Sequence, residues 1–328
     1  MSVVRSYFIT VTASVLFLAV SLCIAMMAGA SPIGVRGVLD ALFGHRTDTG
    51  SLAIISLRLP RVVAGAMVGA SLAVSGMIMQ GITKNPLAEP GLFGVSAGAN
   101  LALSLSMAFG ANYADQVAPF VCFFGALAGI AVVTAVGSLR SVQFSPLRMA
   151  LAGASVSVFC NAVAQGIEFK SNLALGITAW LEGGLSGIQW GSVLVACPWM
   201  AVGLALALAL ATELTVQRLD MDVAQSLGQR TLLIRLSLYA VVALLASASV
   251  YLAGNITFFG LLVPHVVRAI AGGEDKKSMP IAMLLGAGLM MLADAFARFA
   301  IRPYELPLPA VLAVAGLPFF VTAVRKMR

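Results

Sequence analysis

Arginine side chains at the ends of apolar segments are the first groups in this 328-residue chain that could do chemistry. Arg58 and Arg61 flank Pro60, which is tolerated at the start of a helix, and their three-residue spacing places them on one helix face. Such a pair can act as one cationic patch for an acidic partner. The alternative is that these arginines reach lipid headgroups, and Arg298 has Asp294 one turn before it as an internal partner.

A loop with two prolines, residues 85–91, follows the second apolar stretch. Its sequence, Asn-Pro-Leu-Ala-Glu-Pro-Gly, breaks a helix at Pro86 and again at Pro90. Irregular backbone at membrane depth is tolerated only where protein or an aqueous path satisfies its polar groups. This two-proline loop is therefore a candidate gate, and the alternative is a purely structural turn.

A polar stretch between two later apolar segments, the 218–230 segment, carries apolar residues at regular spacing. Leu219, Val223 and Leu227 recur every four residues, which predicts a short amphipathic helix lying outside the membrane. Such a helix can lie in the cleft of a partner. The alternative is an ordinary surface helix.

Other polar residues inside apolar segments give weaker signals. Asn161 and Gln165, one turn apart, can line a conduit or form hydrogen bonds between helices. His265 follows Pro264, where a lone histidine is more typical of a hydrogen-bonded structural residue than of a ligand. The four cysteines lack metal-ligand or CxxC spacing and are interpreted as small core residues: Cys23, Cys122, Cys160 and Cys197. We predict no metal site.

Catalytic motifs are missing from the sequence. It contains no GxxxxGK[ST], no HExxH, no nucleophile elbow and no cluster of carboxylates. We therefore predict that the chain is not an enzyme, binds no cofactor and does not hydrolyse ATP itself. Secondary transporters driven by ion gradients usually keep carboxylates at mid-membrane. The acidic candidates here, Glu168 and Asp294, both stand near the ends of apolar segments, which weakens that alternative.

The composition predicts an all-α integral membrane protein, with residues 1–328 forming a single transmembrane domain. Apolar residues make up 60% of the chain and charged residues 10%, against roughly 25% charged residues in soluble domains. A crossing helix needs about 20 apolar residues. Such runs predict about ten spans, near 7–29, 62–81, 92–109, 118–137, 149–167, 191–211, 236–253, 255–267, 279–297 and 308–324.

Two of these spans leave alternatives open. The eighth is short and contains Pro264, so we expect either a full crossing or a re-entrant helix supported by neighbouring protein rather than lipid. The first, 7–29, is longer than the apolar core of a signal peptide and is interpreted as a retained span. A cleavable signal peptide is the alternative.

The distribution of charge predicts the orientation of the chain. The 20 basic residues are scattered between apolar segments rather than gathered into a stripe, which argues against nucleic acid as a partner and for anchoring in the membrane. If all ten segments cross and both termini are cytoplasmic, most basic residues lie inside, as the positive-inside rule requires. Arg58, Arg61 and Arg298 then lie at the outer ends of their spans, and docking of an acidic partner would explain that local exception.

Two long blocks of sequence resemble the FecCD family of ABC importer permeases. One, at 57–100, combines Leu-Arg-Leu-Pro-Arg with Asn-Pro-Leu-Ala-Glu-Pro-Gly-Leu-Phe-Gly. The other, at 254–298, combines Gly-Asn-Ile-Thr-Phe-Phe-Gly-Leu-Leu-Val-Pro-His with Ala-Asp-Ala-Phe-Ala-Arg. Shorter matches at 148–153, 180–190 and 224–228 extend the resemblance over nearly the whole chain. It implies the fold of a type II ABC importer permease.

The resemblance also implies roles for the candidate site residues. Arg58, Arg61 and Arg298 would receive glutamates of a soluble substrate-binding protein. The inner gate and translocation path would comprise Asn85, Pro86, Leu87, Pro146, Leu147, Asn161 and Gln165. At the second half of the gate, the family would have small hydroxyl residues where this chain has proline and leucine.

In the same family, a cytoplasmic region matching about 213–234 receives the movement of the ATPase. The residues implied in this coupling are Leu219, Asp222, Val223, Ala224, Leu227 and Gly228. The usual Leu-Gly-Glu opening is replaced here by Leu-Asp-Met, and the acidic residue is displaced to Asp222.

The function implied is that of a permease subunit in the bacterial plasma (inner) membrane, importing an iron(III)–siderophore complex. Haem or cobalamin import by the same kind of permease is the alternative, and an ion-coupled secondary transporter is the more distant one. The implied partners are a second permease subunit, either identical or a paralogue, two cytoplasmic ATP-binding subunits that hydrolyse ATP, and an extracytoplasmic substrate-binding protein.

Overall fold

Helices account for almost all of the regular structure in the computed structural model, which describes residues 2–28, 34–44, 49–109, 117–138, 146–170, 184–301 and 304–325. The first half contains α1 (Ser2–Met27), α2 (Val35–Phe43), α3 (Thr49–Ala53), the π-helical turn η1 (Ile54–Arg58), α4 (Leu59–Thr83), the 3-10 turn η2 (Pro90–Phe93), α5 (Val95–Ala108), α6 (Ala118–Ser138) and α7 (Pro146–Lys170). The second contains α9 (Trp190–Ala209), α10 (Ala211–Gln217), α11 (Met221–Ser226), α12 (Thr231–Ala253), α13 (Phe259–Ala271), α14 (Asp275–Phe299) and α15 (Leu308–Arg325).

The apolar helices coincide with the predicted spans, and the all-α membrane fold class is confirmed. Among the described residues, six helices are long and apolar enough to cross a membrane: Tyr7–Met27, Ser51–Thr83, Ala118–Gly137, Trp190–Ala209, Thr231–Ala253 and Asp275–Phe299. Four shorter apolar helices complete the predicted set: Val95–Ala108, Leu151–Ile167, Phe259–Ala271 and Leu308–Pro318.

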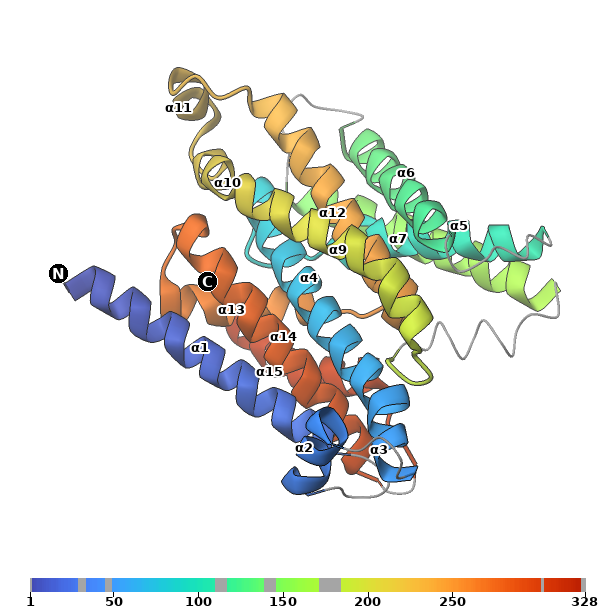
Figure 1. The fold of residues 1–328 in the computed structure, drawn as a ribbon. Coiled ribbons are helices and arrows are strands. Elements are labelled where there is room, and N and C mark those ends of the chain that lie inside the picture. Colours follow the sequence, from blue (N-terminus) through green and yellow to red (C-terminus); the bar gives the residue numbers. More distant parts are fainter. Residues whose placement is uncertain are drawn as a thin grey trace.

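Helix α4 runs through the middle of the molecule and is buried along almost its whole length (Figure 1). It approaches its neighbours closely at two glycines. A Cβ at Gly69 would lie 2.3 Å from the carbonyl oxygen of Gly286 on α14, and one at Gly76 would lie 1.8 Å from that of Gly260 on α13. Small residues at such crossings let helix backbones pack directly against each other in a membrane.

The short helix α13 packs closely against its neighbours. Its 13 residues rise about 20 Å, less than the roughly 30 Å hydrocarbon core, so it does not cross alone as a straight helix. Phe259, Val263 and Val267 on this helix are buried. The Gln80 amide of α4 donates to the Gly260 carbonyl oxygen at 3.4 Å and accepts a hydrogen bond from the Arg268 guanidinium, so α4 holds α13 at two levels.

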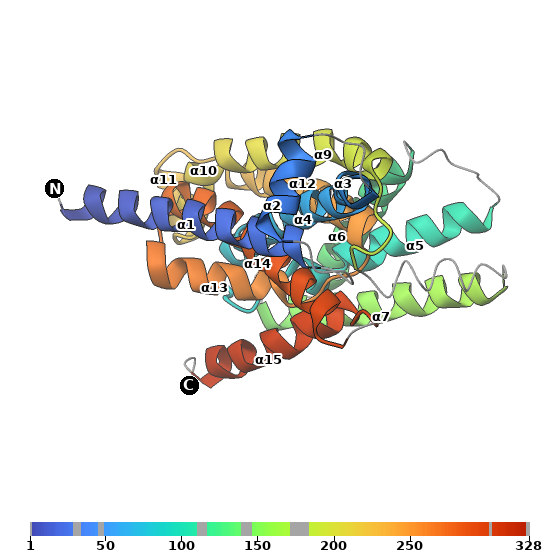
Figure 2. The same ribbon diagram turned by 60° about the horizontal axis from the view of Figure 1, so that its bottom comes forward.

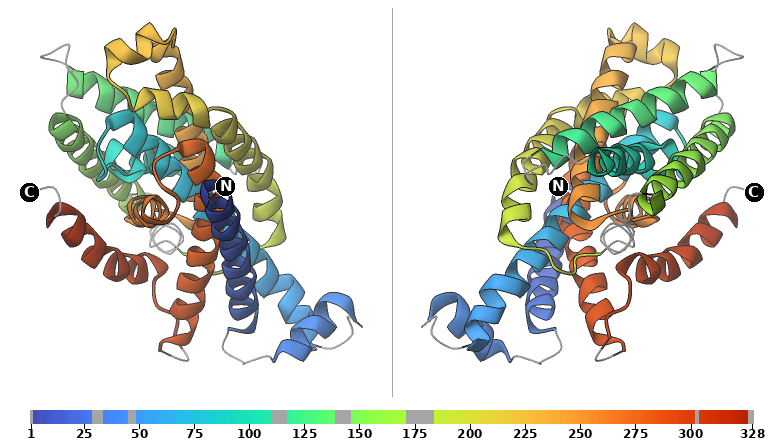
Figure 3. Two further views of the ribbon diagram at one scale, coloured as in Figure 1. Left: turned by 90° about the vertical axis from the view of Figure 1, so that its left-hand side faces the viewer. Right: turned by 90° about the vertical axis from the view of Figure 1, so that its right-hand side faces the viewer.

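The two ends of the molecule carry different short helices. Helices α10 and α11 lie at one end and α2 and α3 at the other (Figures 1 and 3). Helices α7 and α15 lie on the same side of the molecule when it is turned as in Figure 2. The candidate site residues consequently fall into three groups: the three arginines near α2 and α3, the two-proline loop beside α4, and the 218–230 segment around α11.

Candidate functional site

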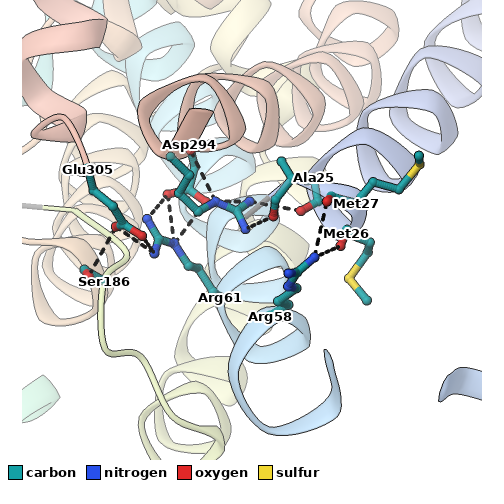
Figure 4. Close-up of polar contacts among 10 residues, drawn as sticks. Ala25, Met26, Met27, Arg58, Arg61, Ser186, Asp294 and Glu305 are labelled. Atoms are coloured by element: carbon teal, nitrogen blue, oxygen red, sulfur yellow. Dashed lines mark hydrogen bonds and ion pairs between the residues drawn. The ribbon is translucent and has the colours of Figure 1, made fainter. Parts of the chain in front are cut away.

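Two of the three predicted docking arginines, Arg61 and Arg298, contact one buried carboxylate, and the third, Arg58, lies near them (Figure 4). Asp294 on α14 accepts hydrogen bonds from Nη2 of Arg61 at 2.8 Å and Nε of Arg61 at 3.1 Å (Figure 4). The same carboxylate forms an ion pair with Nη2 of Arg298 at 3.1 Å. Nη1 of Arg61 donates to Glu305 at 3.0 Å. We call Arg58, Arg61, Asp294, Arg298 and Glu305 the arginine cluster.

Two members of the arginine cluster also bind the end of α1 (Figure 4). Arg298 donates to the carbonyl oxygens of Ala25 at 3.0 Å and Ala28 at 2.9 Å. Arg58 donates to those of Met26 at 3.1 Å and Met27 at 3.2 Å. The last carbonyls of a helix have no partner within the helix and attract cations. The cluster therefore joins the end of α1 to α4 and α14.

The exposure of the cluster limits which of its members a partner can reach. The Arg298 side chain is 4% exposed and the Arg61 side chain 13%, whereas Glu305 is 43% exposed. Glu305 also accepts a hydrogen bond from Ser186 at 3.4 Å. The structure thus brings the predicted docking residues together, but it places Arg61 and Arg298 in internal ion pairs. Docking remains a prediction.

Side-chain hydrogen bonds stabilise the conformation of the two-proline loop. The Asn85 side-chain oxygen accepts a hydrogen bond from the backbone N–H of Leu87 at 3.0 Å, which forms an Asx turn around the exposed Pro86. Ser157 on α7 donates to the Gly91 carbonyl oxygen at 3.2 Å. This loop therefore contacts a helix distant in sequence, and its role as a gate remains a prediction.

A buried acid that the sequence analysis did not single out, Glu89, anchors the same loop. Its carboxyl group accepts a hydrogen bond from the backbone N–H of Phe258, at the start of α13. Phe258 has a left-handed backbone, with φ of 66°, which is unusual for a bulky residue. Burial raises the pKa of Glu89 to about 8, because water no longer solvates the charged form and a single backbone hydrogen bond offsets this only in part.

The other predicted path residues are only partly brought together. Pro146 and Leu147 begin α7, and their side chains lie outside the part of the chain that the structure describes. Asn161 accepts a hydrogen bond from Asn100 on α5 at 3.4 Å, which is the interhelical bond that was one of its two interpretations. Gln165 is exposed on α7.

The 218–230 segment is less regular than predicted. The sequence predicts one amphipathic helix, but α11 covers only Met221–Ser226. Asp220 has an extended backbone, with ψ of 150°, and Gly228 a left-handed one, with φ of 80°, so the helix cannot extend through either position. The reason is local: aspartate favours the N-cap position and glycine the left-handed one.

The residues implied in coupling form an exposed apolar surface around α11. Leu219, Val223 and Leu227 are 43%, 46% and 64% exposed, and Asp222 is exposed beside them. Ala224, on the same helix, is buried. In the described part of the chain, no group of three or more His, Cys, Asp or Glu residues could hold a metal ion.

Comparisons with known proteins agree over the whole fold. A protein-family model described as the FecCD transport family matches residues 17–326. The iron(3+)-hydroxamate import system permease protein FhuB of Bacillus subtilis is 37% identical over 321 residues, covering 98% of this chain and 84% of that protein. The Fe(3+) dicitrate transport system permease protein FecC of Escherichia coli is 36% identical over 301 residues, 90% of each chain.

Another relative and a solved structure extend the comparison. The vitamin B12 import system permease protein BtuC of Yersinia enterocolitica is 36% identical over 292 residues, covering 86% of this chain and 84% of that protein. A metal-chelate type ABC transporter solved in an inward-facing conformation superposes with a TM-score of 0.82 at 26% identity, covering 98% of this chain and 99% of that one.

Proposed function

The chain belongs to the FecCD transport family, and we propose that it is the permease subunit of a binding-protein-dependent ABC importer for an iron(III)–siderophore complex. The observation that carries the proposal is the match along 98% of the chain to a relative named for iron(3+)-hydroxamate import. A second relative is named for Fe(3+) dicitrate transport. Haem or cobalamin is the alternative substrate, and the relative named for vitamin B12 import favours cobalamin.

The proposed assembly supplies what this chain does not carry. Because the sequence contains no P-loop, we assign ATP hydrolysis to two cytoplasmic partner subunits. A second permease subunit, identical or a paralogue, completes the translocation path, and a substrate-binding protein delivers the ferric complex from outside. The permease subunits lie in the bacterial plasma membrane, with both termini of this chain in the cytoplasm.

The proposed mechanism uses the three candidate regions in turn. The arginine cluster lies at the outer end, where an acidic side chain of the binding protein takes the place of the exposed Glu305 on Arg61. At the opposite end, the exposed apolar residues around α11 fit into a cleft of the ATPase. Movement of α11 on ATP binding repacks the two-proline loop, which opens or closes the path.

Uptake by cells tests the substrate class. A strain deleted for this permease should lose uptake of an iron-55-labelled hydroxamate siderophore and regain it when the gene is restored. Labelled cobalamin and haem serve as matched substrates in the same strain. Loss of cobalamin or haem uptake with unchanged ferric-siderophore uptake would contradict the proposed substrate.

A further inference from the structure

Lys84 stands at the junction between α4 and the two-proline loop and contacts the 218–230 segment. Its Nζ donates to the carbonyl oxygen of Leu219 at 2.5 Å and lies 3.7 Å from Oδ1 of Asp220. Leu219 and Asp220 are within the connection between α10 and α11. Lys84 thus contacts the connection that leads into α11, and the next residue, Asn85, is the first residue of the two-proline loop.

The backbone of Lys84 makes the junction sharp. Lys84 caps the C-terminus of α4 in a left-handed conformation, with φ of 50° and ψ of 29°. Among the described residues, Lys84 and Phe258 are the two non-glycine residues with positive φ. Side chains with a Cβ adopt this conformation at a cost, whereas asparagine tolerates it better than most. A change in the Lys84 backbone would redirect the chain as it enters the loop.

Helices α4 and α10 pack closely against each other about one turn before Lys84. A Cβ at Gly81 on α4 would lie 2.5 Å from Cδ1 of Leu214 on α10, and Leu214 is fully buried. The last turn of α4 therefore fits directly against α10. The Lys84 hydrogen bond extends this contact to the connection between α10 and α11.

A buried acid at the start of α14 also anchors the C-terminal end of α10. Asp275, which is 1% exposed, forms an ion pair with Nη2 of Arg218 at 2.7 Å and accepts a hydrogen bond from Thr215 at 3.3 Å. Leu219, which follows the anchored Arg218, is 43% exposed, and Val223 and Leu227 beyond it are exposed as well. The connection between an anchored α10 and an exposed α11 is where bending would concentrate, and Lys84 binds to that connection.

We propose that Lys84 is the positioning residue that transmits movement of the 218–230 segment to the two-proline loop, an inference that rests on the proposed function. Displacement of α11 moves the Leu219 carbonyl and Asp220, and the lysine amine follows them. The left-handed backbone of Lys84 then redirects Asn85 and the two-proline loop, which begins at Asn85. The exposed ion pair alone would contribute little, because Asp220 is 93% exposed and solvent screens it. The hydrogen bond to a backbone oxygen supplies the defined geometry.

The substitution Lys84→Asn tests this link without straining the backbone. Asparagine accepts the left-handed conformation but lacks the amine. The test uses the complete complex of permease, ATPase and binding protein in proteoliposomes, and it measures ATP hydrolysis and ferric-siderophore uptake in the same preparation. We expect ATP hydrolysis to stay close to that of the wild type, whereas uptake per ATP falls at least about tenfold, as loss of a charge-assisted hydrogen bond allows.

Two further variants sharpen the test. Lys84→Arg keeps the positive charge and the donors, so it should restore most of the uptake per ATP. Lys277→Asn is the matched control, because Lys277 is 44% exposed and forms a surface ion pair with Glu274. That control should leave both rates unchanged.

The possible outcomes distinguish the proposed role of Lys84 from a purely structural role and from failure of the proposed function. Unchanged uptake per ATP in Lys84→Asn would overturn the proposal. A parallel fall in ATP hydrolysis and uptake would overturn it as well, because a folding or assembly defect lowers both. A wild-type complex that shows no ATP-driven uptake would instead refute the proposed function, and with it the link.

Discussion

Single buried charges decide how the end of this permease near α2 and α3 is held together. Asp294 is 2% exposed and lies between Arg61 and Arg298, which come from different helices. Each arginine also contacts a second group, Glu305 for Arg61 and the end of α1 for Arg298. A buried charge is tolerated only when it is paired and hydrogen-bonded. The carboxylate is therefore the residue on which the arrangement of the arginine cluster depends.

Replacing this carboxylate should destabilise the protein strongly. Asp294→Asn leaves two arginine side chains without their buried partner, and we expect a loss of about 3 to 5 kcal/mol in the free energy of unfolding. Glu305→Gln is the matched control, because Glu305 is 43% exposed, and it should cost at most about 1 kcal/mol. Thermal unfolding of the purified permease in detergent compares the two variants. Equal melting temperatures for both would contradict this account of the cluster.

The buried Glu89 should make the stability of the protein depend on pH. Its pKa is raised from 4.5 to about 8, so the folded protein keeps this proton over a pH range in which the unfolded chain releases it. The folded state then binds more protons than the unfolded state. This contribution to stability is fully present below about pH 4.5 and is lost as pH rises through about 8.

Glu89→Gln isolates that dependence, since glutamine keeps an oxygen for the Phe258 N–H but does not ionise. Its melting temperature should therefore fall less than that of the wild type between about pH 4.5 and 8. Glu274→Gln, at an exposed carboxylate 2.5 Å from Lys277, is the control and should follow the wild type. Parallel pH curves for Glu89→Gln and the wild type would refute the assignment.

At the scale of helices, the sequence predicted the positions of the apolar helices better than the contacts between them. Hydropathy alone located the spans because crossing a membrane takes a long apolar run. Helix α11 came out shorter than predicted, because Asp220 and Gly228 act through backbone preferences that four-residue spacing does not report. The Arg61–Asp294 pair joins residues 233 apart in sequence, and no local pattern encodes such a contact.

The signature blocks located more of the candidate site than physical patterns did. They placed Arg58, Arg61 and Arg298 in one group, and the structure brings these residues together. They gave no indication of Glu305 as a partner of Arg61, nor of the contact between Lys84 and Leu219. Lysine and glutamate at loop ends are common on any surface, so their partners become visible only in the folded chain.

Helix α4 should tolerate no side chain at its crossing with α13. Gly76→Ala would place a Cβ 1.8 Å from the Gly260 carbonyl oxygen, and overpacking of this kind costs about 1 to 3 kcal/mol or more. Gly191→Ala on α9 is the matched control, because no atom lies within 4 Å of its added Cβ. The melting temperature in detergent should drop for Gly76→Ala and stay unchanged or rise for Gly191→Ala. A stable Gly76→Ala protein would show that the two helices can separate there.

At the scale of the whole molecule, the two ends of the permease carry different kinds of surface. The arginine cluster lies near α2 and α3, and the exposed apolar residues of α11 lie at the opposite end (Figures 1 and 3). Between them, α4 runs from Arg61 in the cluster to Lys84 beside α10. A single buried helix therefore connects the proposed docking site for the binding protein with the proposed contact for the ATPase.

Energy coupling in a purified system tests the central claim most directly. The permease is reconstituted with its ATPase and binding protein, and accumulation of a labelled ferric siderophore is followed with ATP supplied to the ATPase side. The account predicts accumulation that requires ATP, persists with a protonophore and stops when ATP is omitted. Accumulation driven by a proton gradient without ATP, or collapse with the protonophore while ATP is present, would contradict it.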